Sequence, residues 1–148
     1  MMKNAGYTKQ ERSFIALMRV LAIAFLGTAT LFAVMPNYLP GYLTSVGNGL
    51  FNWGAPPFPQ LSDHFWAVHS AVYMLLLSYL CMVAQHNIVR NIGYTRPVII
   101  ATILASIGFC VCFFLCGEHF VYLVTAVLNG AAGIVTWRFY HRAQKSRT

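Results

Sequence analysis

Residues 97–140 read PVIIATILASIGFCVCFFLCGEHFVYLVTAVLNGAAGIVTWRFY, which is two long apolar runs joined at Gly117 and Glu118. Each run has about the 20 residues that an α-helix needs to cross the hydrocarbon core of a bilayer. Gly117 suits the C-terminal end of the first helix and leaves Glu118 to begin the next. The stretch therefore predicts two transmembrane helices, at about 97–116 and 119–140, in a tight antiparallel hairpin.

Two further apolar runs precede this hairpin and predict helices at about 12–35 and 64–85. Thr8 and Glu11 have the spacing of a capping box at the start of the first of these helices. With 58% hydrophobic and only 9% charged residues, the composition is not that of a soluble domain. We therefore predict an all-α fold, an integral membrane four-helix bundle that forms a single domain over residues 1–148.

The basic residues indicate the orientation. All ten Lys and Arg side chains lie on what would be one side of a membrane, where they precede or open the first run, separate the second from the third, or close or follow the fourth. The two segments on the other side, residues 36–62 and 117–118, contain neither Lys nor Arg. The positive-inside rule then places both termini in the cytoplasm. Although the net charge is +7, the charges flank the spans and form no separate basic stripe, so we expect membrane lipids and no nucleic acid as partners.

Four arginines are expected at the depth of the cytoplasmic lipid headgroups: Arg19, Arg90, Arg96 and Arg138. Arg19 lies inside the first helix, about two turns beyond Arg12, where its long stem can carry the guanidinium group back to the interface. The alternative is a buried partner for Arg19, either a headgroup or a neighbouring subunit.

Segment 36–62 is the one substantial connection outside the predicted spans, and it contains five prolines and several aromatic residues. A short helix is predicted there because four apolar residues recur at helical spacing: Leu43, Val46, Leu50 and Trp53. The segment carries no charge, so this apolar face is expected in the outer interface of the membrane. We interpret it either as a lid or docking surface for a partner, or as an aromatic-rich anchor.

Small residues form stripes on the last two predicted helices and indicate how these helices pack. The stripes comprise Ala101, Ala105, Gly108, Cys112 and Cys116 on one helix and Ala126, Gly130 and Gly133 on the other, with Thr125 and Asn129 beside the second stripe. Small side chains let helix backbones approach closely, which is how helices gain van der Waals contact in lipid. Asn129 lies near mid-membrane, so we expect its amide to form an interhelical hydrogen bond.

Ionisable side chains gather toward the outer face and suggest a metal or haem site, with His64, His69, His119 and Glu118 as its candidate residues. Imidazole and carboxylate groups ligate zinc or copper, and imidazoles also ligate haem iron. His64 and His69 point about 140° apart on an ideal helix, so only one of them is expected to pair with His119. The alternative is interfacial histidines and a capping acid that bond to backbone or water.

Cys110, Cys112 and Cys116 invite a thiol-redox interpretation, which their spacing disfavours. Helical residues two apart diverge, and residues four apart are usually held too far from each other for a disulfide. Free cysteines also serve as small apolar packing residues. The predicted spans contain no Asp, Glu or Lys, which ion-coupled transporters normally need at depth, so transport by this chain alone is not expected.

The layout resembles the DoxX-like superfamily of small four-helix bacterial membrane proteins, and the closest piece is Tyr122–Gly130, YLVTAVLNG. Those proteins have a longer first outer connection and a tight hairpin between the last two helices. Many of them carry an acidic residue where this chain has Asn129. The resemblance implies a bacterial inner membrane and, since some members are subunits of quinone-linked oxidoreductases, a place in a larger complex. It implies no catalytic residue.

We predict a non-catalytic accessory subunit of a larger inner-membrane complex, because small-residue helix faces and an aromatic outer segment occur without a coherent active site. Two alternatives stay open. One is a membrane redox protein that uses a quinone, a haem or a metal near the outer histidines. The other is a protein that binds a hydrophobic ligand within the bundle.

Overall fold

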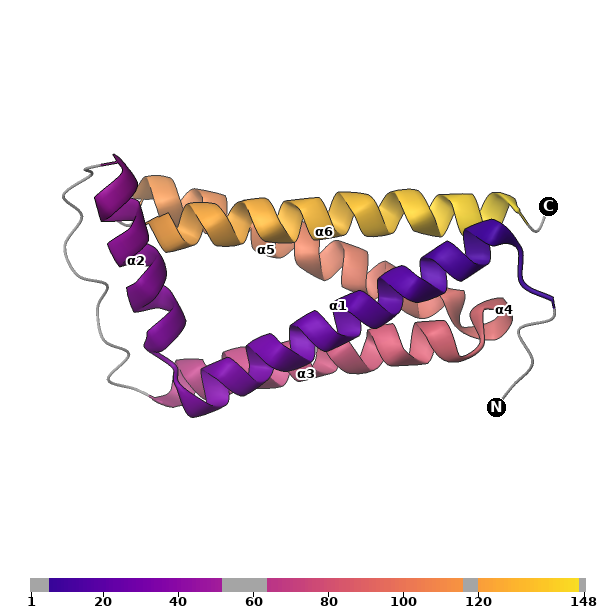
Figure 1. Ribbon diagram of the computed structural model, residues 1–148, viewed down its shortest axis with the longest axis horizontal. Helices are drawn as coiled ribbons and strands as arrows, with labels where there is room; N and C mark the ends of the chain where they lie inside the picture. Colours follow the sequence, from indigo (N-terminus) through magenta and orange to yellow (C-terminus); the bar gives the residue numbers. More distant parts are fainter. Residues whose placement is uncertain (1–5, 52–63, 116–119, 147–148) are drawn as a thin grey trace.

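The structure, a computed structural model, describes residues 6–51, 64–115 and 120–146 of the 148-residue chain (Figure 1). Its elements in chain order are α1 (Lys9–Val34), α2 (Tyr38–Phe51), α3 (His64–His86), α4 (Ile88–Asn91), the 3₁₀ turn η1 (Ile92–Tyr94), α5 (Thr95–Leu115) and α6 (Phe120–Lys145). No strand occurs in these three stretches. Among the described elements, α1, α3, α5 and α6 are long and apolar enough to cross a membrane. The predicted all-α fold with four candidate spanning helices is confirmed.

The first helix, α1, begins at the predicted capping box. The backbone N–H of Glu11 donates to Thr8 Oγ1 (3.3 Å), and the backbone N–H of Thr8 donates to Glu11 Oε2 (2.8 Å). These bonds provide acceptors for N–H groups that the first turn of a helix cannot satisfy internally. The helix ends at Val34, shortly before Pro36, which lacks the N–H needed to continue it. The capping box is therefore confirmed.

Two helix boundaries differ from the expected ones. α5 begins two residues before Pro97, which the first turn of a helix accommodates because its N–H groups have no intrahelical acceptor. The connection before it is not a simple turn but folds into α4 and η1, and α4 is capped by a hydrogen bond from the Arg90 N–H to Asn87 Oδ1 (3.3 Å).

α6 runs five residues beyond its expected end, where Arg142 and Lys145 offset the negative end of the helix dipole.

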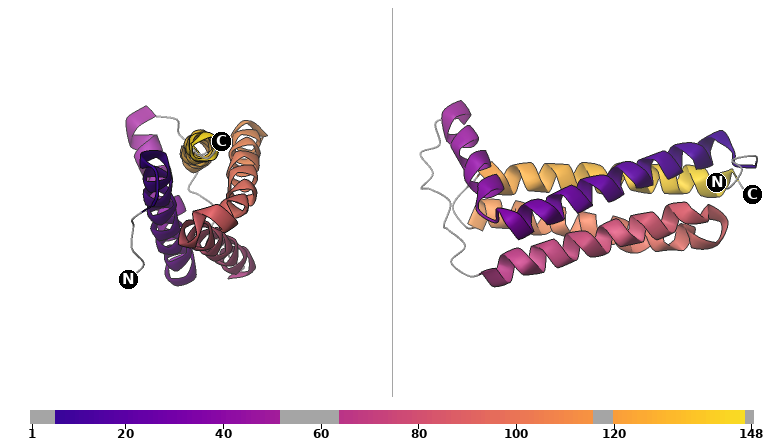
Figure 2. Two further views of the ribbon diagram at one scale, coloured as in Figure 1. Left: turned by 90° about the vertical axis from the view of Figure 1, so that its right-hand side faces the viewer. Right: turned by 60° about the horizontal axis from the view of Figure 1, so that its bottom comes forward.

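The four long helices form a closed ring in which α1 contacts α3, α3 contacts α5, α5 contacts α6 and α6 contacts α1 (Figure 2). Packing is far more extensive within the α1–α3 pair and the α5–α6 pair than between them. One serine joins each pair. Ser78 Oγ on α3 donates to the Ala22 carbonyl on α1 (2.8 Å), and Ser106 Oγ on α5 donates to the Ala126 carbonyl on α6 (2.7 Å). The fold is thus two tight helix pairs that are joined more loosely.

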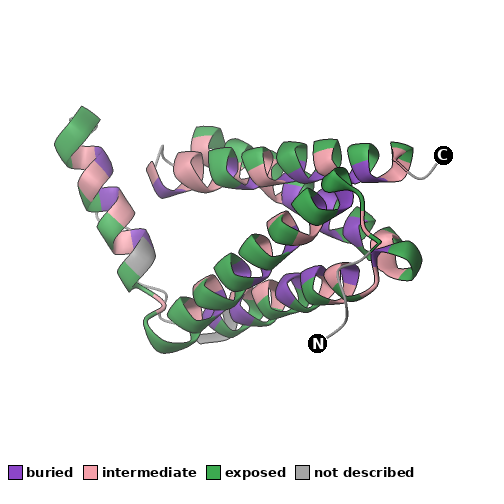
Figure 3. Ribbon diagram, turned by 45° about the vertical axis from the view of Figure 1, so that its right-hand side comes forward, coloured by how far each residue is buried: buried purple, intermediate pink, exposed green. Residues whose placement is uncertain are grey.

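The hydrophobic core lies at the end of the bundle where α1 begins and α6 ends. Its buried members are Phe14, Met18, Ala22, Phe25, Leu77, Cys81, Ala84, Ile88, Val98, Ile99, Tyr140 and Ala143. On α5 the buried residues are confined to the first eight positions of the helix. Exposed residues recur along all four long helices (Figure 3). This distribution suits a bundle whose outer surface faces lipid rather than water.

Toward the opposite end the two helix pairs diverge, and α2 crosses from the end of α1 to the start of α6 (Figure 1). The first residues of α1 and the last residues of α6 lie together at the end that holds the core. Four spanning helices in alternating direction require the start of the first helix and the end of the last helix to lie on the same side.

Candidate functional site

The contact between α5 and α6, called the α5–α6 seam below, contains two of the predicted packing glycines. A Cβ atom added to Gly133 would lie 2.8 Å from Ile103 Cγ1 and 2.9 Å from Thr102 Oγ1. A Cβ atom added to Gly130 would lie 2.8 Å from Ser106 Oγ. All three distances are well below ordinary van der Waals contact, so the two backbones approach as closely as they do only because these positions have no side chain. The seam extends to Ala126, which is buried.

Gly108 does not belong to this seam, contrary to the expectation. It is exposed, and a Cβ atom added there would meet nothing within 4 Å. Gly108 follows Ser106 by two residues, which is roughly 200° around a helix of 3.6 residues per turn, so it faces away from α6. The other described members of the predicted stripe on α5 are half-buried and flank the contact: Ala101, Ala105 and Cys112.

The buried amide of Asn129 bonds within its own helix. Asn129 Nδ2 donates to the Thr125 carbonyl (2.9 Å), one turn back along α6. The prediction of an interhelical hydrogen bond is therefore wrong, because a carbonyl in the preceding turn of α6 accepts from the amide. Ser106 makes the interhelical bond instead, and sequence reasoning did not single it out. The signal was present, since a serine inside an otherwise apolar span is a frequent interhelical donor.

The short helix expected in the outer segment is present as α2, which packs on α6 through a different face from the predicted one. Pro40, Thr44 and Gly47 are buried. Two members of the predicted face, Leu43 and Val46, are half-buried, Leu50 is 70% exposed, and Trp53 lies outside the described residues. Among the described members of the predicted face, Leu50 alone is thus left largely uncovered by the rest of the described chain.

Gly47 allows α2 to dock on the first residue of α6. A Cβ atom added to Gly47 would overlap the side chain of Phe120, with Phe120 Cγ at 2.6 Å. The Phe51 ring adds to this contact, because its centroid lies 5.4 Å from that of Phe120. At the other end of α2 the rings of Tyr38 and Tyr42 stack at 6.3 Å and are exposed. Exposed tyrosines of this kind are typical of the boundary between lipid and water.

The proposed metal or haem ligands fall mostly outside what the structure describes. The His64 side chain, Glu118 and His119 are not among the described residues, and His69 is exposed on α3. Within the described residues no three His, Cys, Asp or Glu side chains lie close enough together to hold a metal ion. Of the cysteines there, Cys81 is buried, Cys110 is exposed and Cys112 is half-buried. Cys116 also lies outside the described residues.

Two of the four predicted headgroup arginines have partners inside the chain. Arg19 Nε donates to Gln85 Oε1 (3.1 Å), which links α1 to α3 near the end of α3. Arg96 Nε donates to Tyr140 Oη (2.8 Å), and its guanidinium carbon lies 5.9 Å from the centre of the same ring. Both arginines remain exposed, as do Arg90 and Arg138. A partner for Arg19 therefore exists, but it belongs to this chain and is not buried.

Tyr140 is the polar centre of the end that holds the core. Its ring is buried, and its hydroxyl oxygen accepts from Arg96 and from Gln144 Nε2 (2.9 Å). The Arg96 bond positions α5 against the last turns of α6, whereas the Gln144 bond lies within α6. A charged donor makes the stronger kind of hydrogen bond, so the Arg96 bond is the more important of the two.

The helices and their apolar surfaces define the class, a multi-pass helical membrane protein. Comparison with protein-family models, with curated proteins and with solved structures found no match to this chain.

Proposed function

We propose that this chain is a non-catalytic accessory subunit of a larger complex in a bacterial inner membrane. The observation that carries the proposal is the outer part of α5, residues 103–115, in which no residue is buried. Beyond Ile103, which contacts Gly133 of α6, its exposed large apolar side chains are Leu104, Ile107, Val111, Phe114 and Leu115. This surface is available to another transmembrane helix. The chain's likeness in layout to the DoxX-like superfamily, which includes complex subunits, supports the same proposal.

Gly108 gives this surface a position for close helix approach. Leu104, Gly108 and Val111 share one side of α5 at spacings of four and three, and space is open above Gly108. A neighbouring helix can approach closest at a glycine flanked by larger residues, because its backbone then contacts the glycine backbone directly. The residue predicted to pack against α6 is therefore proposed to pack against a partner instead.

The subunit is proposed to have both termini in the cytoplasm. The start of α1 and the end of α6 lie together (Figure 1). In the sequence, the Lys and Arg residues lie near the ends of the spans that belong to this side of the predicted topology. Fusions at the C-terminus test this orientation. A green fluorescent protein fusion should fluoresce and an alkaline phosphatase fusion should be inactive, whereas the reverse pattern would refute it.

The accessory role is tested by extraction of the tagged chain from its own membranes in mild detergent, followed by native mass spectrometry. We expect a mass well above the 16.5 kDa of the chain, with defined protein partners. The Gly108→Leu variant should lose those partners, because its side chain fills the open position. The matched control is Ala131→Leu, at an exposed position of α6, which should keep them.

Two other outcomes would count against the accessory role. A lone chain or homo-oligomer that carries extra small-molecule mass would favour the redox or ligand-binding alternative. Deletion of the gene should loosen the parent complex without abolishing its chemistry, so full loss of turnover in an intact assembly would also contradict the proposal.

A further inference from the structure

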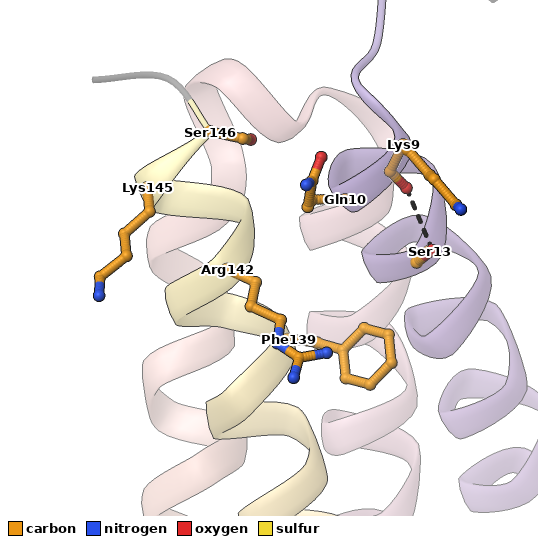
Figure 4. Close-up of a pocket in the computed structure, with 7 residues that line it drawn as sticks. All are labelled: Lys9, Gln10, Ser13, Phe139, Arg142, Lys145 and Ser146. Carbon is orange, nitrogen blue, oxygen red and sulfur yellow. Dashed lines mark hydrogen bonds between the residues drawn. The ribbon is translucent and has the colours of Figure 1, made fainter.

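A pocket of about 570 Å³ lies between the start of α1 and the end of α6 (Figure 4). α1 contributes Lys9, Gln10 and Ser13, and α6 contributes Phe139, Arg142, Lys145 and Ser146. The two helices belong to different pairs, so this is a place where the loosely joined halves of the bundle face each other.

The lining of the pocket is basic and polar above an aromatic ring. Lys9, Arg142 and Lys145 are exposed, and Figure 4 shows Arg142 directed from α6 toward α1 beside Phe139. In the same view the ammonium groups of Lys9 and Lys145 extend to opposite sides of the opening. Their long stems allow both groups to swing toward an anion held between the helices.

The helices are already joined beside the pocket by a polar contact. Thr8 Oγ1 and Ser146 Oγ lie 3.1 Å apart, and Ser146 Oγ also donates to the Ala143 carbonyl (2.9 Å). Glu11, the one carboxylate among the described residues, is buried and accepts from the Thr8 backbone N–H in the helix cap. The pocket lining itself contains no acidic residue.

The pocket falls at the depth of lipid phosphates. A hydrocarbon core of ~30 Å takes about 20 residues, which run from Phe120 to near Phe139 on α6 and from Val34 back to near Ile15 on α1. Lys9 and Lys145 then each lie about 9 Å beyond the hydrocarbon, by the helix rise of ~1.5 Å per residue. Cations and hydroxyls therefore meet at headgroup level, with the Phe139 ring at the boundary below them.

We propose that this pocket binds a phosphate-bearing anion, a chemistry that an anionic phospholipid headgroup shares with free phosphate. Lys9 and Arg142 hold the phosphate from opposite helices, since basic pockets between transmembrane helices on the cytoplasmic side suit such groups. The Arg142 guanidinium can bond two phosphate oxygens at once. Occupation of the pocket would tie α1 to α6 and thereby clamp together two helix pairs that otherwise meet mainly through the core.

The test uses the full chain purified in mild detergent with phosphatidylglycerol, or with phosphatidylcholine as the neutral lipid, and counts the retained lipids by native mass spectrometry. We expect one phosphatidylglycerol to be retained selectively. The double variant Lys9→Gln/Arg142→Gln should bind it about thirtyfold more weakly, because each lost cation near the surface removes roughly a fivefold preference. The control, Arg12→Gln, removes an exposed charge of α1 outside the pocket and should retain the lipid like the unchanged chain.

Competition by inorganic phosphate identifies the source of the anion. Displacement of phosphatidylglycerol at millimolar phosphate, with a matching rise in melting temperature, would point to free phosphate. Retention of the lipid under the same conditions would point to the headgroup, and either result supports the site. The proposal is overturned if the pocket variant, folded by circular dichroism, retains the lipid as well as the control, or if neither phosphate nor phosphatidylglycerol binds to the unchanged chain.

Discussion

Replacement of Gly133 by alanine is expected to loosen the α5–α6 seam. The new Cβ atom would lie 2.8 Å from Ile103 Cγ1 and 2.9 Å from Thr102 Oγ1, where ordinary contact is 3.4–4 Å. The threonine hydroxyl cannot turn aside freely, because it already donates to carbonyls in the preceding turn: Val98 (2.9 Å) and Ile99 (3.0 Å). The helices must therefore move apart.

The magnitude follows from two opposed terms. Overpacking costs about 1–3 kcal/mol. Alanine is the better helix former and offsets up to ~1 kcal/mol of that loss. We expect Gly133→Ala to lower the free energy of unfolding by roughly 1–3 kcal/mol relative to the same change at an open position, where the gain in helix propensity is the same. Gly130→Ala should lose less, about 0.6 kcal/mol, because it meets only a serine hydroxyl, which can rotate at the expense of its interhelical bond.

The assay is unfolding in mixed micelles of mild detergent and dodecyl sulfate, followed by far-ultraviolet circular dichroism. Gly108→Ala is the matched control, since it lies on the same helix pair and a Cβ atom there meets nothing within 4 Å. The expected order of stability is Gly108→Ala, then Gly130→Ala, then Gly133→Ala. The reasoning would be refuted if Gly108→Ala proved as destabilising as Gly133→Ala, because the seam would then involve the other side of α5.

Three further changes test other contacts. Ser78→Ala removes the buried hydrogen bond between α3 and α1, while the exposed Arg19–Gln85 bond stays in place, and should lower the free energy of unfolding in the same assay by about 0.6–1.7 kcal/mol. Gly47→Leu should release α2 from α6 and speed amide hydrogen exchange over α2; Gly49→Leu, at a position where a Cβ atom meets nothing within 4 Å, should leave the exchange unchanged. Tyr140→Phe leaves two donors without their acceptor and should destabilise by about 1–3 kcal/mol, whereas the exposed Tyr94→Phe should be nearly neutral.

Hydropathy and end signals were enough to predict the helices, but not the faces through which they pack. The apolar runs and the Thr8–Glu11 spacing indicated spanning helices and a cap, and both are present. The sequence did not distinguish Gly133 from Gly108, because lipid and protein are equally apolar surroundings and a small residue suits either. Gly133 is buried and Gly108 is exposed because of how each helix is oriented about its own axis, which tertiary packing determines.

The polar residues show the same limit. Asn129 was expected to reach across to another helix, yet its own backbone supplies the acceptor. The apolar residues of α2 were expected to form its contact face, but Gly47, not Leu50, faces α6. A glycine lets the two elements approach more closely than a leucine does, and this contact depends on close approach.

The serine links within the two pairs have a consequence for how the chain reaches its membrane-embedded state. Ser78 and Ser106 each donate to a helix carbonyl that also accepts the N–H four residues further along its own helix. That carbonyl therefore keeps its helical hydrogen bond when the two helices are apart. A serine in a lone helix can turn to the carbonyl four residues back in its own helix. Each span can therefore enter the bilayer separately without leaving either serine hydroxyl unsatisfied. For these two serines lateral assembly exchanges one hydrogen bond for another, so van der Waals packing, rather than a stranded serine hydroxyl, holds each helix pair together.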